Sequence, residues 1–288
     1  MTNTISFDSP PKKICILRLS ALGDVTHVVP VVRVIQKNWP ETEITWVCGK
    51  LEKKLISGLH VIRFVEFDKK QGWRAYRDLY QALKGEVFDV LLHMQVAARA
   101  NLASLCIRSR VRLGWDRSRS RDFHQLFINK SVPVAPFQHQ VQGFLSFARA
   151  LGLDAEQPVW NFPVLDEGLA FANQHISKEK RTLLISACSS HTLRNWNAEG
   201  YARVADYAIE HLGMQVILSG GLSQAEKEMA DAIESRMNYT VINLVAKDTL
   251  QQLTGLLNGV DVVISPDSGP VHIANALGTS VIGLYACT

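Results

Sequence analysis

Residues 14–40 read ICILRLSALGDVTHVVPVVRVIQKNWP, and this stretch decides the fold class of the chain. Residues 14–19 form an apolar run without polar alternation, which is typical of a strand buried on both faces of a parallel sheet. Between residues 24 and 37 apolar residues recur at helical spacing, and Trp39-Pro40 ends the helix because the residue before a proline avoids the helical region. A strand followed by a helix is the repeating unit of an α/β sheet.

The same unit recurs along the rest of the chain. In the first half we predict strands at residues 44–48, 62–67, 87–93 and 110–114, and helices at residues 51–56, 73–84, 99–107 and 141–151. In the second half we predict strands at residues 182–186, 215–219, 241–244, 260–265 and 280–284, and helices at residues 198–212, 224–237, 249–257 and 271–277. Residues 116–137 lack periodicity and are predicted to form a loop, and residues 152–163 are predicted to be a linker. The pattern predicts an α/β protein with two doubly wound parallel-sheet domains, residues 1–164 and 165–288.

Composition excludes several classes of protein. The length of 288 residues suits two domains, because compact domains usually hold roughly 100 to 200 residues. An apolar share of 47% and a charged share of 20% exclude a disordered chain. No apolar run approaches the roughly 18 residues of a membrane helix, and residues 1–13 lack the apolar middle of a signal peptide. We therefore expect a cytoplasmic protein.

The cysteines stand singly, without the paired spacing of a zinc or redox site. They are Cys15, Cys48, Cys106, Cys188 and Cys287. Most of them lie in apolar runs, and we expect reduced core residues.

Charge is distributed unevenly between the two halves. Residues 1–165 contain 23 Lys and Arg against 14 Asp and Glu, whereas the remaining residues contain 8 against 13. This asymmetry indicates an anionic partner that meets only the first domain, unless a solvated surface accounts for it.

The first loop to examine is SALGD, residues 20–24, because ligands of parallel α/β sheets bind beyond the carboxyl ends of the strands. The loop matches neither the dinucleotide-binding glycine motif nor the P-loop. Asp24 is either the N-cap of the following helix or a catalytic carboxylate. His27, one turn later, is either a ligand contact or a histidine on the helix surface.

Two loops of the second half suit a nucleotide. Residues 186–196, SACSSHTLRNW, combine hydroxyls, a cation and a following helix, which indicates a phosphate site or a polar turn. In residues 220–226, GGLSQAE, the paired glycines let a ligand approach the backbone closely. Glu226 either accepts hydrogen bonds from ribose hydroxyls or lies in the first helical turn for its favourable dipole interaction.

The loop SPDSGPVHIA, residues 265–274, is the most unusual of the chain. Pro270 fits the first turn of a helix without losing a hydrogen bond, and the free N–H groups beside it suit an anion. Asp267 would repel a phosphate if it pointed inward. We therefore expect Asp267 to cap the helix or to hold a loop amide or a ligand hydroxyl.

Seven arginines lie within residues 99–121: Arg99, Arg108, Arg110, Arg112, Arg117, Arg119 and Arg121. Such density suggests nucleic acid, but the nearby aromatic residues, Trp115 and Phe123, do not form a stacking pattern. An anionic small-molecule or lipid acceptor is the alternative, as is a solvated basic loop. We expect no nucleic-acid partner.

Two motifs together carry a family resemblance: RLSALGDVTHVVP at residues 18–30 and SPDSGPVHIANALG at residues 265–278, with Ser189, Ser190, Arg194 and Trp196 between them. The chain resembles glycosyltransferase family 9, the bacterial ADP-heptose:lipopolysaccharide heptosyltransferases. The resemblance implies the GT-B architecture, in which two Rossmann-like domains face a central cleft. It also implies an acceptor on the first domain, a sugar nucleotide on the second, and inversion without a metal or other cofactor.

The resemblance also assigns roles to residues. It makes Asp24 the catalytic base, Ser189, Ser190 and Arg194 diphosphate contacts, and Glu226 a ribose contact. It places Asp267, Ser268, Gly269 and His272 at the sugar and phosphates of the donor. For the acceptor we expect contacts from His27, Arg99, Arg117, Arg119 and Arg121.

The expected reaction moves heptose from ADP-L-glycero-D-manno-heptose to the Kdo or inner-core region of lipopolysaccharide, by a monomer on the inner face of the inner membrane. The alternatives are a sugar-nucleotide epimerase of the same architecture and an inactive protein that binds sugar nucleotide or lipid. A transferase requires the acceptor for its reaction, whereas an epimerase does not. Turnover of ADP-heptose distinguishes the transferase from an inactive binding protein. The family motif usually continues through Tyr-Gly-Pro-Thr into further helices, whereas this chain ends at Tyr285-Ala286-Cys287-Thr288, so we expect the C-terminal segment to be missing.

Overall fold

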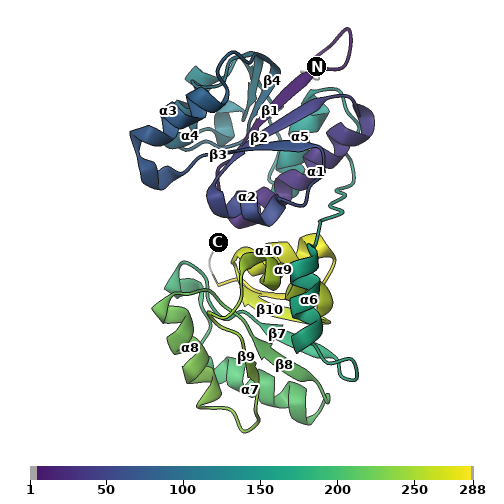
Figure 1. The fold of residues 1–288 in the computed structure, drawn as a ribbon, viewed down its shortest axis with the longest axis vertical. Helices are drawn as coiled ribbons and strands as arrows, with labels where there is room; N and C mark the ends of the chain where they lie inside the picture. Colours follow the sequence, from purple (N-terminus) through teal and green to yellow (C-terminus); the bar gives the residue numbers. More distant parts are fainter. Residues whose placement is uncertain (1–4, 287–288) are drawn as a thin grey trace. The chain divides into compact units, whose positions relative to one another are not determined.

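The computed structural model describes residues 5–286 and divides into two compact units, Met1–Trp160 and Asn161–Thr288. Each unit contains one parallel sheet with helices on both faces (Figure 1). The predicted fold class, α/β with two doubly wound parallel sheets, is confirmed.

The first unit contains a six-stranded sheet of order β3-β2-β1-β4-β5-β6, in which all neighbouring pairs are parallel. The strands are β1 (Lys13–Leu17), β2 (Glu43–Cys48), β3 (Ile62–Glu66), β4 (Phe88–His93), β5 (Ser109–Gly114) and β6 (Lys130–Ser131). The chain winds outward from β1 in both directions, so the order reverses between β1 and β4. Ligands of doubly wound sheets bind at this reversal.

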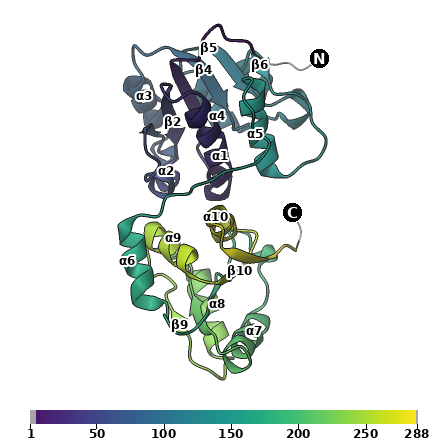
Figure 2. The same cartoon turned by 90° about the vertical axis from the view of Figure 1, so that its right-hand side faces the viewer.

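Helices cover both faces of this sheet. One face carries α1 (Leu22–Asn38) and α5 (Gln140–Ala150), which pack side by side (Figure 2). The other face packs against α3 (Trp73–Ala82) and α4 (Ala98–Ser104), and α2 (Lys50–Ile56) follows β2. The core on the α3 and α4 side includes Leu79, Ala100 and Ala103, all with no exposed surface. As predicted, α1 ends at Trp39, which is its C-cap residue.

The second unit contains a five-stranded parallel sheet of order β11-β10-β7-β8-β9, which reverses between β7 and β10. The strands are β7 (Thr182–Ile185), β8 (Gln215–Leu218), β9 (Ile242–Asn243), β10 (Val262–Pro266) and β11 (Ser280–Leu284). The helices α7 (Ala198–Glu210) and α8 (Gln224–Glu234) cover one face. The helices α6 (Asp166–His175), α9 (Leu250–Gly259) and α10 (Gly269–Leu277) form the other layer.

One prediction about the elements is wrong, and one helix was not predicted. Residues 116–137 are not simply a loop: they contain 3-10 turns at Arg117–Arg119 and His124–Phe127, and the two-residue strand β6. Such short elements have too few residues to show a period. Helix α6 was not predicted, because its sequence DEGLAFANQH lacks a strong apolar stripe.

Four cysteines fall within residues 5–286, and all of them are free thiols. Cys15 and Cys48 are buried as predicted, whereas Cys106 and Cys188 are only partly buried. Cys287 lies outside the described residues. Across residues 5–286, no helix is both long enough and apolar enough to cross a membrane.

Candidate active site

Asp24 lies at the reversal point of the first sheet, in the first turn of α1. Of the two alternatives for Asp24, the N-cap role is wrong, because Ala21 is the N-cap and Asp24 is the third helical residue. Its Oδ2 atom accepts a hydrogen bond from the Ala21 N–H at 3.2 Å and pairs with the Arg18 guanidinium. Among residues 5–286 no polar contact reaches Oδ1 of Asp24. One carboxylate oxygen is therefore fixed, and the other is available to a ligand.

Arg18 fixes Asp24 because it is itself immobilised. Its Nη1 donates to the Met94 carbonyl at 2.7 Å, and its guanidinium lies 5.3 Å from the centre of the Phe144 ring. Burial lowers the pKa of Arg18, and the facing Asp24 partly offsets that effect. No role was predicted for Arg18, although it directly follows β1.

Asp24 lines a pocket of about 830 Å³ in the first unit. Of the predicted acceptor residues, Arg119 and Arg121 line the same pocket. His27 does not lie on the helix surface, since it is only 5% exposed. Its ring packs 5.8 Å from that of His139, which does line the pocket, so His27 contacts the pocket wall from the buried side.

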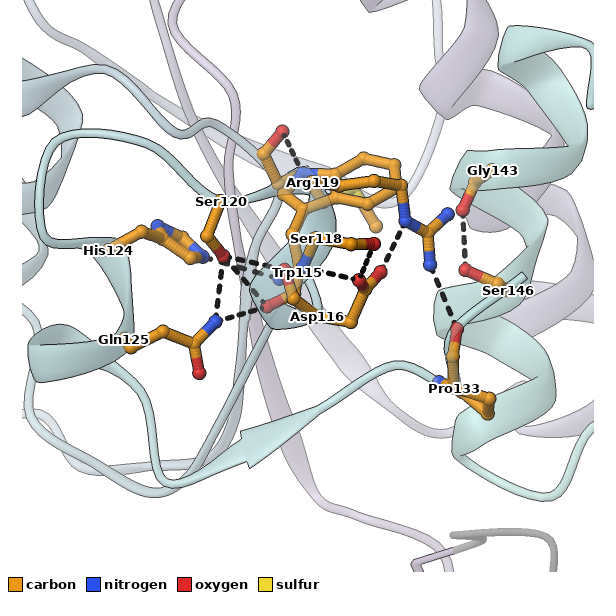
Figure 3. A network of polar contacts seen from close by, with 11 residues as sticks. Trp115, Asp116, Ser118, Arg119, Ser120, His124, Gln125, Pro133, Gly143 and Ser146 are labelled. Atoms are coloured by element: carbon orange, nitrogen blue, oxygen red, sulfur yellow. Dashed lines mark hydrogen bonds and ion pairs between the residues drawn. The ribbon is translucent and has the colours of Figure 1, made fainter. Parts of the chain in front are cut away.

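Arg119 belongs to an internal network (Figure 3). Its guanidinium pairs with Asp116, donates to the Pro133 carbonyl at 2.9 Å, and lies 4.8 Å from the centre of the Trp115 ring. Burial acts to raise the pKa of Asp116, but hydrogen bonds from Ser118 and Arg119 outweigh it and hold that pKa below its ordinary value. The side chain of Arg119 therefore organises the loop as well as the pocket.

The side chain of Arg112 also bonds within the protein. Its guanidinium donates to the carbonyls of Phe127, Ile107 and Ser104 at 2.7, 2.9 and 2.9 Å. The seven arginines are consequently not one uniform basic face, because at least two of them hold the backbone together.

A second pocket of the first unit, of about 300 Å³, lies beyond the carboxyl ends of β1 to β4. Four cations line it: Lys50, Lys69, Lys70 and Arg99. Lys69 and Lys70 were missed in the sequence, although their place directly after the third predicted strand was a usable signal. Arg117 lines neither of these two pockets.

In the second unit, Asp267 pairs with two groups at the reversal between β7 and β10. Its Oδ2 lies 2.9 Å from Arg194 Nη1, and its Oδ1 lies 3.4 Å from His272 Nε2. Asp267 does not cap α10, whose N-cap is Ser268, and among residues 5–286 no loop amide donates to it, so these two alternatives are wrong. The third alternative, a contact with a ligand hydroxyl, stays a prediction. The charge of Asp267 is met by the two groups that would face a phosphate, which removes the expected repulsion.

Hydroxyl and amide groups surround this cluster. Ser189 Oγ bonds to the His191 carbonyl at 2.9 Å, whereas Ser190 is exposed. Ser268 Oγ lies 2.9 Å from Ser265 Oγ, and Gly269 opens α10. The first amides of a helix have no acceptor within it, which suits an anion at this position.

Glu226 is held by its own loop. It accepts from the Gly221 N–H at 2.7 Å and from Ser223 Oγ at 2.6 Å. A Cβ atom on Gly221 would lie 2.9 Å from Glu226 Oε2, so Gly221 is needed for this closure. Glu226 also lines a cavity of about 10 Å³ with Cys188 and Gly220, roughly the space of one water molecule.

Asp248 is a titratable group that the sequence analysis missed. Burial raises its pKa to about 6, against a hydrogen bond that it accepts from Ser219 Oγ at 3.1 Å. Glu226 also raises this pKa by its negative charge. Within residues 5–286, no group of three or more His, Cys, Asp and Glu side chains is placed to hold a metal ion.

Comparisons with known proteins identify relatives over the whole chain. Residues 76–288 match the model of glycosyltransferase family 9 (heptosyltransferase). The chain is 42% identical over 282 residues to the lipopolysaccharide core heptosyltransferase OpsX of Haemophilus influenzae, covering 97% of this chain and 80% of that protein.

Solved structures share the fold. A family 9 glycosyltransferase of Veillonella parvula superposes with a TM-score of 0.86 at 21% identity, covering 99% of this chain and 84% of that one. The Escherichia coli heptosyltransferase WaaC, bound to ADP-2-deoxy-2-fluoro heptose, superposes with a TM-score of 0.76 at 20% identity. The match covers 94% of this chain and 88% of that one. A protein of Listeria monocytogenes described as a UDP-N-acetylglucosamine 2-epimerase superposes with a TM-score of 0.60 at 14% identity. The match covers 96% of this chain and 80% of that one.

Proposed function

The chain belongs to glycosyltransferase family 9, and from this premise we propose that it transfers heptose from ADP-L-glycero-D-manno-heptose to the Kdo or inner-core region of lipopolysaccharide. The identity of 42% to a lipopolysaccharide core heptosyltransferase, over 97% of this chain, carries the proposal. We assign the acceptor to the domain of residues 1–164 and the sugar nucleotide to the domain of residues 165–288.

In the proposed reaction, Asp24 is the base. Its Oδ1 atom, which lacks a polar contact among residues 5–286, takes the proton of the acceptor hydroxyl as that oxygen attacks the anomeric carbon. The bond from the anomeric carbon to the diphosphate oxygen breaks, and ADP leaves. A single displacement inverts the configuration at that carbon. The ion pair with Arg18 holds the orientation of the Asp24 carboxylate.

The leaving ADP requires charge stabilisation, and we assign this to the cluster around Asp267. Arg194 and the amides at the start of α10 suit the diphosphate, with Ser189, Ser190, Ser268, Gly269 and His272 around it. Asp267 orients Arg194 and His272 toward this position. Glu226 accepts three hydrogen bonds from its own loop, and its carboxylate retains an acceptor site for a ribose hydroxyl. In this proposal these groups supply hydrogen-bond donors to the leaving diphosphate, and no metal ion takes part.

The decisive experiment measures ADP release from ADP-heptose with and without Kdo-bearing lipid A as acceptor, in the presence of EDTA. Transfer requires acceptor-dependent ADP release and a heptosylated product with inverted configuration. Conversion of the donor without acceptor would indicate the epimerase, and donor binding without turnover would indicate an inactive binding protein. Loss of transfer in EDTA would exclude the metal-independent mechanism.

We also propose that the protein works as a monomer on the cytoplasmic face of the inner membrane, where such an acceptor is made. The basic surplus of residues 1–165 supports this location, since the inner leaflet is anionic. Membrane fractionation and sedimentation velocity test the two statements separately.

A further inference from the structure

Four large apolar side chains of the first unit are exposed to solvent on neighbouring segments. Leu102 and Leu105 on and after α4 are 40% and 64% exposed, and Phe123 and Leu126 are 82% and 80% exposed. Single exposed apolar residues are ordinary, but a group of them at one place marks an interaction surface. We call these four residues the apolar face.

The two segments that carry the apolar face are bonded to each other at one end. The carboxylate of Asp122 accepts from the Ala98 N–H at 2.9 Å, and the Asp122 carbonyl accepts from the Asn101 side chain at 2.8 Å. Residues 98–101 of α4 therefore lie beside residue 122.

At the other end, the Arg112 guanidinium bridges the carbonyls of Ser104 and Phe127. Between these two sets of hydrogen bonds, the side chains of Ala103 and His124 are buried and have no exposed surface. All four members of the apolar face are therefore exposed on two segments that contact each other.

Three cations, Arg99, Arg108 and Arg121, are exposed on or next to the segments that carry the apolar face. Of the two carboxylates in this part of the chain, Asp116 is buried against Arg119, whereas Asp122 is exposed and accepts from the Ala98 N–H. The exposed charges therefore have a basic surplus. A surface of exposed Leu and Phe within a basic rim fits the boundary between anionic headgroups and acyl chains.

Two arginines of the basic rim line pockets of the first unit. Arg99 lines the pocket of about 300 Å³, and Arg121 lines the pocket of about 830 Å³ that contains Asp24. A lipid-linked sugar that reaches Asp24 would leave its acyl chains near this rim.

We propose that the first unit docks on an anionic lipid bilayer through the apolar face Leu102, Leu105, Phe123 and Leu126, with Arg99, Arg108 and Arg121 on the headgroups. The proposal rests on the proposed function for its purpose, which is to present Asp24 to an acceptor held in the bilayer. The contact itself requires only the lipid surface.

The test is co-sedimentation of the full chain with vesicles of phosphatidylglycerol and phosphatidylcholine that contain no acceptor. We expect binding to these vesicles and little to pure phosphatidylcholine. Phe123→Ser/Leu126→Ser should weaken binding roughly 10- to 100-fold, because two large apolar side chains are lost. Arg108→Gln should weaken it about fivefold and more at low salt. The conservative Phe123→Trp/Leu126→Ile should keep the wild-type affinity.

Tyr207→Ser/Leu212→Ser is the matched control, because these side chains are 56% and 59% exposed in the second unit and should not affect vesicle binding. ADP affinity and the thermal midpoint of each variant show whether it is folded, and Leu105→Ser replaces any variant that is not. Wild-type vesicle affinity in the folded Phe123→Ser/Leu126→Ser protein would overturn the proposal, as would absence of binding by the wild type. A dimer in sedimentation velocity that this variant abolishes, without vesicle binding, would assign the face to a second copy instead. Because the vesicles lack acceptor, these results stand whether or not the transfer assay succeeds.

Discussion

At the scale of single residues, Asp24 is the most direct test of the chemistry. Asp24→Asn removes the proton acceptor while leaving an oxygen for the Ala21 N–H. We expect turnover to fall roughly 100-fold or more, the usual effect of losing a positioned base, and ADP affinity to stay unchanged. Steady-state kinetics with calorimetry of ADP binding measure both. Near-normal turnover in a folded Asp24→Asn protein would leave Asp24 only its role in the first turn of α1.

Arg194 tests the donor cluster. Arg194→Ala should weaken ADP binding by about 1 to 3 kcal/mol, because it removes a charge-assisted contact to the diphosphate. Calorimetry without added metal measures this, and Arg236→Ala, at an exposed position after α8, is the matched control. Unchanged ADP affinity, or a strict requirement for Mg²⁺, would contradict the assignment.

The places of the proposed site residues in the fold were predictable, but their partners were not. Asp24 and Asp267 follow predicted strands, and the rule that ligands bind at the carboxyl ends of strands located both. Arg18 holds Asp24 and Arg194 holds Asp267 at 73 residues' separation, and the sequence alone does not show such pairing. For Asp267 the sequence shows the neighbour along the chain, α10, but not the spatial neighbours Arg194 and His272.

At the scale of elements, the buried strands were predicted well because burial on both faces leaves continuous apolar runs. Helix α6 was missed because it packs through small residues. A Cβ atom on Gly168 would lie 2.4 Å from the Gln251 carbonyl oxygen, and one on Gly255 would lie 2.0 Å from the Gly168 carbonyl oxygen. Close contact between α6 and α9 therefore replaces the apolar stripe that a sequence pattern can detect.

The close contact between α6 and α9 predicts the effect of adding a side chain at Gly255. Gly255→Ala should destabilise the second unit by about 1 to 3 kcal/mol, since overpacking outweighs the gain of roughly 1 kcal/mol in helix propensity. Urea denaturation followed by circular dichroism measures the free energy of unfolding. Ala170→Ser, on the exposed side of α6, should change it by less than about 0.5 kcal/mol. A Gly255→Ala protein as stable as the wild type would mean that the two helices separate easily.

At the scale of the whole molecule, the basic surplus of residues 1–165 should attract the acceptor. Because Arg119 is paired with Asp116, reversing it would disturb the loop, so Arg117→Glu/Arg121→Glu is the cleaner test. We expect a higher acceptor KM and unchanged ADP affinity. Added salt should mimic the variant, since exposed charges are screened over about 8 Å at physiological ionic strength. Normal use of acceptor at low salt would make these arginines ordinary solvated surface.

The stability of the first unit should also depend on pH, through two buried histidines. His93 and His124 have no exposed surface, and their ring centres lie 4.4 Å apart. Burial lowers the pKa of His124 to about 4. Burial also lowers the pKa of His93 well below its ordinary value, with His124 and Arg112 adding to the effect.

The sign of this dependence follows from proton uptake. Above about pH 6.5 the folded and unfolded chains both hold neutral imidazoles, so these groups give no slope. Between about pH 6.5 and pH 4 the unfolded chain binds protons that the folded chain excludes, and the free energy of unfolding falls with pH. His124 alone accounts for about 3 kcal/mol over that range. Asp248 in the second unit acts in the opposite sense, because its raised pKa lets the folded chain take up a proton first.

The measurement is therefore the pH dependence of the free energy of unfolding in the wild type and in His124→Gln. The glutamine side chain can still bond to Asn101 and to the Trp115 N–H. The loss of unfolding free energy between pH 6.5 and pH 4 should be smaller in the variant by about 3 kcal/mol. His60→Gln, at an exposed position, should leave the slope unchanged. If the free energy of unfolding changed with pH equally in the wild type and in His124→Gln, the His124 ring would take up its proton as readily in the folded chain as in the unfolded chain.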